Sequence, residues 1–193
     1  NNSLYLADVK FTSLFLEGSK GFDAILPEAA ECRLAGFFYK PELTSNTKLL
    51  YIHGAADDYT LSKPCEDYVK KIKSEPGQIE IDMKEGWYHG FHYGQKPKKY
   101  KAMTVSKCPA FFVNNEGYVV GNEWPDLVLN KYKLYSSIDE FYDAAQIEPR
   151  KAWKTSFKML KKEKCLDRGV TIGGNHMDEY MPQFINFFKE NLI

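Results

Sequence analysis

The sequence lacks long apolar runs and an excess of charge of either sign. No stretch approaches the roughly 20 consecutive apolar residues that a membrane-spanning helix needs. The 26 basic and 26 acidic side chains give a formal net charge of zero, so the chain has no long-range attraction to nucleic acids or to acidic membrane surfaces. Both absences argue against a membrane protein and a nucleic-acid-binding protein, and they favour a soluble, globular chain.

Cysteine is scarce and widely spaced, at Cys32, Cys65, Cys108 and Cys165. No two cysteines form a Cys-x-x-Cys pair, which argues against a structural zinc site and against a thioredoxin-like redox motif. Four buried thiols fit this spacing, and so do two disulfides in an oxidising compartment. The spacing does not decide between these alternatives, and it does not show which cysteines would pair.

The clearest unit of the sequence is a strand, a helix and a second strand. Residues 48–53 form a continuous β-prone run, as expected for a central parallel strand that is covered on both faces. A helix is predicted to begin at Ser62, with Pro64 in its first turn. Residues 79–83 alternate apolar and acidic side chains and predict the second strand. Because the connection is a crossover helix, the two strands should be parallel, with their functional loops at their carboxyl ends.

The rest of the chain predicts further helices and short strands around this unit. The lysines between residues 96 and 101 are interpreted as a solvated loop. The other predicted elements are a helix over residues 3–16 ended by Gly18, a strand over residues 22–26, a hairpin over residues 111–120, a helix capped by Ser137, a helix that begins at Pro149, and a terminal helix over the last 15 or so residues. We therefore expect one α/β domain over residues 1–193, with a mainly parallel sheet flanked by helices.

Two side chains with acid–base chemistry follow the two predicted parallel strands. Asp57 lies in the loop after the first strand, and His89 lies just past the second. Both should project from the same edge of the sheet, where neighbouring strands are about 4.8 Å apart, so the carboxylate and the imidazole can meet. In a catalytic triad the carboxylate orients the imidazole, which takes the proton of the nucleophile. The order of acid and then histidine is that of the α/β-hydrolases.

Residues 53–60 (HGAADDYT) and 85–92 (EGWYHGFH) resemble the acid loop and the catalytic-histidine loop of the dienelactone hydrolase family, within the α/β-hydrolase superfamily. The similarity covers most of residues 20–192. It implies an α/β-hydrolase-like fold, of which this chain is an incomplete, C-terminal part. It also implies an esterase-type hydrolase acting on a carboxylic ester or lactone through a nucleophile–His–Asp triad. Asp57 would be the acid and His89 the base, and no cofactor or metal would be needed.

The resemblance also bears on location and partners. Cys32 and Cys65 stand where some secreted members of the family carry cysteine, which slightly favours an exported or periplasmic protein over a cytoplasmic one. The expected partners are a small ester or lactone substrate and either the N-terminal part of the same protein or a second copy of the chain. Neither nucleic acid nor a membrane is expected as a partner.

Neighbouring residues compete for the two catalytic assignments. Asp58 is adjacent to Asp57, but the family spacing from Gly54 favours Asp57, and Asp58 is expected to cap the following turn. His92 competes with His89, and the His-Gly-Phe sequence of the family favours His89. A metal site formed by these two histidines and either aspartate is a further alternative, although no third soft ligand is evident.

The two other histidines are expected not to be catalytic. His53 ends a buried strand and is interpreted as structural. His176 precedes the last helix, where the histidine of an α/β-hydrolase could also lie. The resemblance places the segment around His176 after the catalytic loop, which argues against it.

The nucleophile of such an enzyme lies in a Gly-x-Ser-x-Gly elbow between a strand and a helix. The nearest match is residues 17–21 (EGSKG), which lack the first glycine and follow a predicted helix, so we interpret Ser19 as a turn residue. The sequence also begins with Asn1 and not with Met. We therefore expect that the elbow and the oxyanion hole lie upstream of Asn1 and that this chain is a fragment or a processed product. The alternative is a catalytically incomplete binding or structural module.

Overall fold

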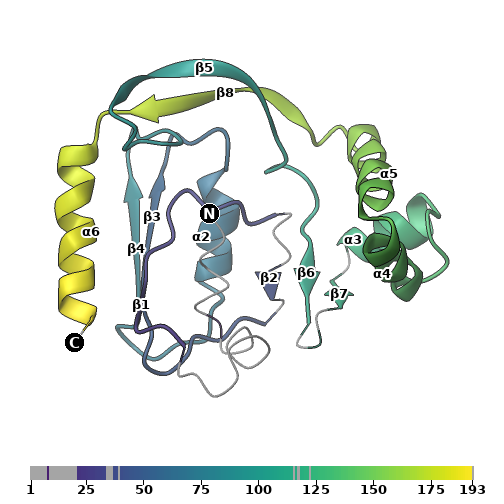
Figure 1. The fold of residues 1–193 in the computed structure, drawn as a ribbon, viewed down its shortest axis with the longest axis horizontal. Coiled ribbons are helices and arrows are strands. Elements are labelled where there is room, and N and C mark those ends of the chain that lie inside the picture. The colour runs from purple at the N-terminus through teal and green to yellow at the C-terminus, as the bar shows by residue number, and fades with distance from the viewer. Residues whose placement is uncertain are drawn as a thin grey trace.

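A computed structural model describes residue 8 and residues 21–33, 37–38, 40–114, 116, 118–121 and 123–192. The predicted helix over residues 3–16, its end at Gly18 and the turn at Ser19 lie outside these residues. In chain order, the described elements are β1 (Ala24–Ile25), β2 (Phe37–Phe38), β3 (Lys48–Gly54), α2 (Ser62–Val69), β4 (Ile79–Lys84), β5 (Gln95–Thr104), β6 (Phe112–Val113), β7 (Val119–Val120), α3 (Glu123–Pro125), the π-helical segment η2 (Asp126–Lys131), α4 (Ile138–Ile147), α5 (Pro149–Lys162), β8 (Asp167–Gly174) and α6 (Met177–Asn191) (Figure 1).

A three-stranded parallel sheet in the order β1-β3-β4 carries the site described below. The register places Leu49 of β3 opposite Ile79 of β4, and Gly54 opposite Lys84. Helix α2 connects the two strands. The predicted strand–helix–strand unit and its parallel pairing are therefore confirmed, and so is a short strand within residues 22–26.

Alternation along β3 explains why its residues 49–52 are apolar without interruption. Leu49 and Tyr51 belong to one core cluster with Cys65 and Val69 of α2. Leu50 and Ile52 point to the other face, where they form a second cluster that includes Tyr180 of α6 and Trp87. Successive side chains of a strand point to opposite faces, so a strand covered by a helix on each face must be apolar at every position. Figure 1 shows α2 and α6 on either side of the sheet.

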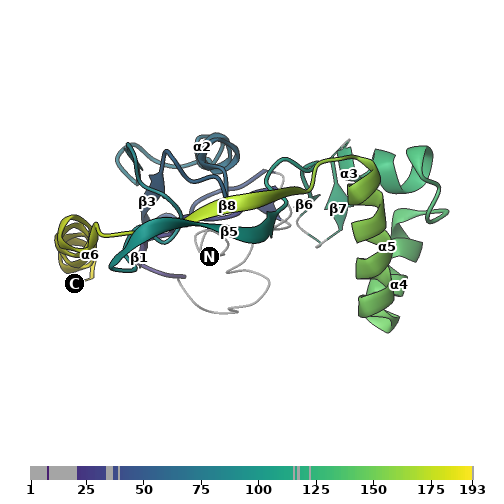
Figure 2. The same ribbon diagram turned by 90° about the horizontal axis from the view of Figure 1, so that it is seen from above.

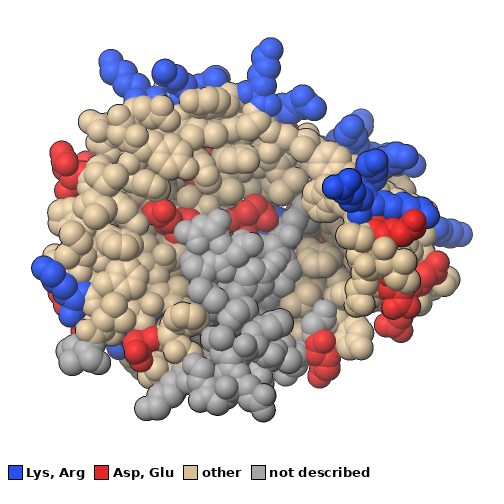
Figure 3. Space-filling view, viewed as in Figure 1, with Lys and Arg blue, Asp and Glu red and all other residues tan. Residues whose placement is uncertain are grey.

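Strands β5 and β8 form a two-stranded antiparallel ribbon, which arches across the carboxyl ends of β3 and β4 (Figures 1 and 2). The prediction of a loop for the lysines between residues 96 and 101 is therefore wrong, because they lie within β5. Residues 95–101 are all exposed, so no apolar alternation marks them as a strand. Lys and Arg side chains stand along this edge of the molecule (Figure 3).

A third core cluster lies between β7, η2 and the helices α3, α4 and α5. It includes the buried side chains of Val128, Phe141 and Leu160. The predicted hairpin is confirmed by the antiparallel pairing of β6 with β7. The predicted caps are confirmed as well: the Ser137 hydroxyl accepts a hydrogen bond from the Glu140 amide at 3.1 Å, and α5 begins with a proline.

The four cysteines form two disulfides, Cys32–Cys65 and Cys108–Cys165. The first bond holds the segment after β1 to α2, and the second connects the segment after β5 to the segment after α5. This pairing decides between the alternatives that the spacing left open. The described part of the chain is a mixed α/β structure, and none of its helices is long and apolar enough to cross a membrane.

Candidate active site

The loop after β3 and the loop after β4 lie against each other at the carboxyl edge of the parallel sheet. Main-chain hydrogen bonds connect them, from the Ala55 amide to the Lys84 carbonyl at 2.8 Å and from the Ala56 amide to the Trp87 carbonyl at 3.1 Å. The approach is so close that a Cβ atom at Gly54 would lie 2.1 Å from the Trp87 carbonyl oxygen. Glycine is therefore required at the point where β3 ends.

This packing brings Asp57 and His89 together, as the sequence predicted. The Asp57 Oδ2 atom lies 3.0 Å from His89 Nδ1. The side chain of Asp57 is fully buried, whereas the imidazole of His89 is 19% exposed. The other ring nitrogen, Nε2, makes no hydrogen bond with any of the described residues. The imidazole is thus held on one side by a carboxylate, and its second nitrogen remains available.

The Asp57 carboxylate is surrounded by donors from its own loop. Its Oδ1 atom accepts hydrogen bonds from the main-chain amides of Tyr59 and Thr60, both at 2.9 Å. Its Oδ2 atom lies 3.0 Å from the Thr60 hydroxyl, in addition to the contact with His89. These bonds fix both carboxylate oxygens, so the acceptor for the imidazole N–H has a defined position.

Two side chains of β3 support the carboxylate from within the core. The Tyr51 hydroxyl is hydrogen-bonded to His53 Nδ1, and His53 Nε2 lies 2.7 Å from the Thr60 carbonyl and 3.3 Å from Asp57 Oδ2. A carbonyl oxygen can only accept, so His53 Nε2 carries a proton and Nδ1 accepts from the tyrosine. His53 is fully buried, as expected for the end of a buried strand, and it also helps to satisfy Asp57.

The electrostatic surroundings keep Asp57 ionised. Burial acts to raise the pKa of this carboxyl group, but the hydrogen bonds from His53, His89 and the Thr60 amide lower it by more, so that the pKa lies well below its ordinary value. Burial and the nearby Asp57 charge raise the pKa of Tyr51, which stays protonated. A buried carboxylate that remains charged at neutral pH can stabilise an imidazolium formed beside it.

The β5–β8 ribbon holds both loops in place. Asp58 accepts hydrogen bonds from the amide and the hydroxyl of Thr171 in β8, at 2.6 Å and 3.0 Å. The expectation that Asp58 caps its own turn is therefore wrong, because its carboxylate is used by a strand far along the chain. The Gly173 amide of β8 donates to the His89 carbonyl at 2.7 Å. One strand thus positions the acid loop and the histidine loop together.

Thr60 and Tyr59 are contacts of the dyad that sequence reasoning missed. The Thr60 hydroxyl lies 3.1 Å from His89 Nδ1 and 3.0 Å from the Ala29 carbonyl. The ring of Tyr59 meets the imidazole edge to face, with centroids 4.8 Å apart. Both residues occur in the HGAADDYT segment, but a threonine and a tyrosine in a loop carry no sequence signal that would separate these contacts from ordinary packing.

The two other candidate histidines pack on the α6 side and do not contact Asp57. His92 stacks on Tyr180 and lies 3.7 Å from Glu28. His176 stacks on the buried ring of Trp87, with centroids 4.6 Å apart. Across the described residues, no group of three or more potential ligands is arranged to hold a metal ion, so the alternative of a metal site at His89 and His92 receives no support.

No described serine or cysteine is hydrogen-bonded to His89. All four cysteines are in disulfides. Ser106, in the segment after β5, donates its hydroxyl hydrogen to the Tyr59 carbonyl at 3.1 Å. The described residues therefore bring a buried carboxylate and an imidazole together without a serine or cysteine beside them. Comparisons of the chain with protein-family models, with curated proteins and with solved structures found no match. The chemistry of Asp57, His89 and their surroundings is thus the basis for a functional interpretation.

Proposed function

We propose that this chain is part of a carboxylic ester or lactone hydrolase of the α/β-hydrolase type, similar to the dienelactone hydrolases, and that Asp57 and His89 are the acid and base of its catalytic triad. The observation that carries the proposal is the 3.0 Å contact between the buried carboxylate of Asp57 and Nδ1 of a partly exposed imidazole. Two further features support the proposal: residues 53–60 and 85–92 resemble the acid loop and the histidine loop of that family, and the parallel sheet places both loops at one edge.

In this reaction His89 moves a proton twice. Its Nε2 atom takes the proton of a serine or cysteine as that nucleophile attacks the ester carbonyl, and the imidazolium then gives the proton to the departing alcohol. Water then attacks the acyl-enzyme; Nε2 takes the proton of the water and returns it to the serine or cysteine, which departs. Asp57 holds Nδ1–H throughout, which fixes the tautomer that leaves Nε2 free to act as a base.

The nucleophile would come from outside the described residues, and the sheet has a place for it. Strand β1 is at one edge of the order β1-β3-β4, and no described strand pairs with its outer side. A further parallel strand could pair there, since an open edge presents unpaired main-chain groups. A turn at the carboxyl end of that strand would lie on the same sheet edge as Asp57 and His89.

One observation favours a second candidate function, a binding or structural module with an incomplete triad. Within the described chain, Nε2 of His89 has no nucleophile beside it, and a chain without a nucleophile and an oxyanion hole would be nearly inert. The two functions differ in a simple property. The hydrolase requires a strand followed by Gly-x-Ser-x-Gly or Gly-x-Cys-x-Gly elsewhere in the native protein, and the module does not.

The deciding experiment uses the native gene product and measures hydrolysis of p-nitrophenyl acetate. His89→Ala should lower the rate by about three orders of magnitude or more, as expected for removal of a triad base. His176→Ala is the matched control, because this histidine is also half-buried but does not contact Asp57. An inactive native protein, or a rate that His89→Ala leaves unchanged, would reject the hydrolase and favour the binding module.

A further inference from the structure

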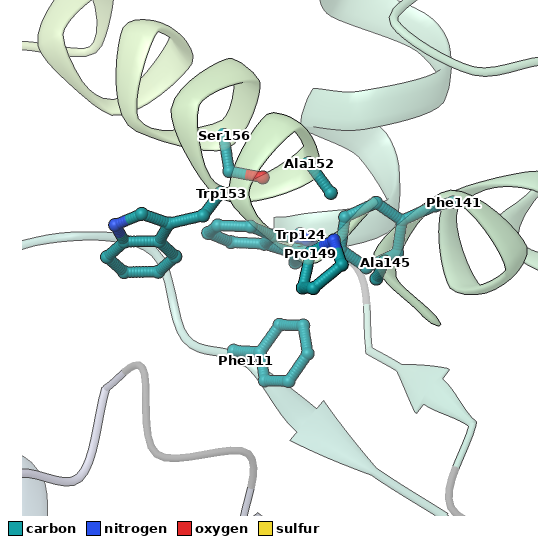
Figure 4. Close-up of a pocket in the computed structure, with 8 residues that line it drawn as sticks. All are labelled: Phe111, Trp124, Phe141, Ala145, Pro149, Ala152, Trp153 and Ser156. Carbon is teal, nitrogen blue, oxygen red and sulfur yellow. The ribbon is translucent and has the colours of Figure 1, made fainter. Parts of the chain in front are cut away.

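An apolar pocket lies in the helical part of the molecule, away from the catalytic loops. It has a volume of about 200 Å³ and is lined by Phe111, Trp124, Phe141, Ala145, Pro149, Ala152, Trp153 and Ser156. Figure 4 shows that α5 contributes Ala152, Trp153 and Ser156, whereas α4 contributes Phe141 and Ala145. None of these residues contacts Asp57 or His89, so the pocket is separate from the candidate active site.

The pocket exists because small residues stand between large rings. Ala145 of α4 and Ala152 of α5 provide little side-chain volume where the two helices face each other. The ring of Phe111 meets that of Trp124 edge to face, with centroids 5.3 Å apart, and forms a rigid wall. Trp153 stands at the rim and is 57% exposed. A tryptophan that is more than half exposed beside an apolar pocket offers a surface that a ligand could cover.

Two polar groups lie at this pocket. Ser156 borders it, and no described residue is hydrogen-bonded to its hydroxyl. The indole N–H of Trp124, which also lines the pocket, is buried and has no acceptor among the described residues. Buried polar groups are nearly always hydrogen-bonded in folded proteins, so a polar atom of a ligand would find an unused donor at Trp124 and an available hydroxyl at Ser156.

We propose that this pocket binds a small, neutral aromatic molecule with one hydrogen-bonding group, such as a phenol. The size fits, because an apolar cavity of about 150 Å³ accommodates benzene. None of the described residues that line the pocket is charged, which disfavours an ionic ligand because its charge would be desolvated without compensation. The aromatic walls contact the ring of the ligand, and the Ser156 hydroxyl exchanges a hydrogen bond with its polar group.

The indole N–H signals in ¹H–¹⁵N spectra test this assignment directly. The chain has three tryptophans, of which Trp124 and Trp153 line the pocket and Trp87 lies in the core beneath α6. Titration with phenol should shift the signals of Trp124 and Trp153 saturably and leave that of Trp87 in place. The absence of a saturable shift, or equal shifts of all three signals, would overturn the proposal.

Two variants locate the bound ring and its hydrogen bond. Ala145→Leu fills the pocket and should weaken phenol binding at least ten-fold, whereas Ala144→Leu, the same change at a neighbouring position of α4 that does not line the pocket, should leave it unchanged. Ser156→Ala should weaken phenol binding by about two- to ten-fold, the usual effect of one neutral hydrogen bond, and leave toluene binding unchanged. Unaltered affinity in Ala145→Leu, or equal effects of Ser156→Ala on both probes, would contradict the assigned site.

Discussion

Replacement of Asp57 by asparagine tests the proposed dyad with the smallest change in shape. The carboxylate has two acceptor oxygens. Oδ1 accepts from the amides of Tyr59 and Thr60, and Oδ2 faces His89 Nδ1 at 3.0 Å. An asparagine keeps one acceptor, and the two main-chain donors determine that it occupies the Oδ1 position. Its NH₂ group, a donor, then faces His89 Nδ1 in place of the acceptor Oδ2.

This reversal changes the tautomer of the imidazole. With an NH₂ group opposite it, Nδ1 of His89 must accept, so the proton moves to Nε2 and the base is lost. The loss of an oriented and correctly protonated imidazole lowers kcat by about 10⁴-fold in a serine hydrolase. The native protein carrying Asp57→Asn should show a loss of this size in p-nitrophenyl acetate hydrolysis.

The effect on stability is measured separately from the effect on the rate. The contacts of Oδ2 with His89 and His53 are lost, and each charge-assisted hydrogen bond contributes about 1.5–3 kcal/mol to the free energy of unfolding. The Thr60 hydroxyl can rotate to accept from the new NH₂ group and offset part of the loss. Denaturation in urea, measured on the same samples, separates a damaged fold from a damaged dyad.

Asp58→Asn is the matched control for this experiment. Asp58 binds the amide and hydroxyl of Thr171 and does not contact His89. An asparagine can accept from the amide and donate to the hydroxyl, so the rate should stay within about three-fold of wild type, equivalent to less than 1 kcal/mol. A wild-type rate in Asp57→Asn, or an equal loss in Asp58→Asn, would refute the assignment of the acid.

Three further predictions follow from the same contacts. The pKa of Asp57 is lower in the folded than in the unfolded chain, so its ionised form stabilises the fold above the unfolded pKa of about 3.9, and this stabilisation is lost as the pH falls below that value toward the folded pKa. Urea midpoints measured from neutral to acidic pH should therefore fall less steeply in Asp57→Asn than in the wild type. An identical slope in the two proteins would contradict the prediction. Gly54→Ala should lower the free energy of unfolding by about 1–3 kcal/mol or more, since its Cβ would meet the Trp87 carbonyl, and an unchanged Tm by calorimetry would show that the two loops are not in close contact. Replacement of both Cys32 and Cys65 by alanine should lower the free energy of unfolding by about 2–4 kcal/mol. Mass spectrometry of tryptic peptides from the unreduced protein should recover the Cys32–Cys65 and Cys108–Cys165 pairs, and any other pairing would refute the arrangement.

The β5–β8 ribbon binds both loops of the candidate site through a single strand, β8. Thr171 holds the acid loop through Asp58, and Gly173 holds the histidine loop through the His89 carbonyl. Because both contacts come from one strand, movement of β8 would change the distance between Asp57 and His89. The precision of the dyad therefore depends on residues more than 80 positions away from it in the chain.

Local patterns in the sequence determined the central unit and the helices α4, α5 and α6, whereas they did not predict α3 and η2. The continuous apolar run before Gly54 specifies a strand buried on both faces, and the alternation of residues 79–83 specifies its partner, because side chains point to opposite faces of a strand whatever surrounds it. A crossover helix forces the two strands to be parallel, so the meeting of Asp57 and His89 at one edge could be predicted without a structure. The caps at Ser137 and Pro149 are equally local, since they depend on main-chain groups within one turn.

The tertiary structure alone decided what depends on contacts between distant segments. Strand β5 is exposed along most of its length, so its residues carry no burial pattern and only the pairing with β8 makes them a strand. The hydrogen bonds between Thr171 and Asp58, the pairing of the cysteines and the pocket between Phe111 and Ala152 all join positions whose proximity no spacing encodes. In each case the contacting residues are brought together only by the tertiary structure. A sequence pattern predicts only contacts between residues that belong to the same turn or strand.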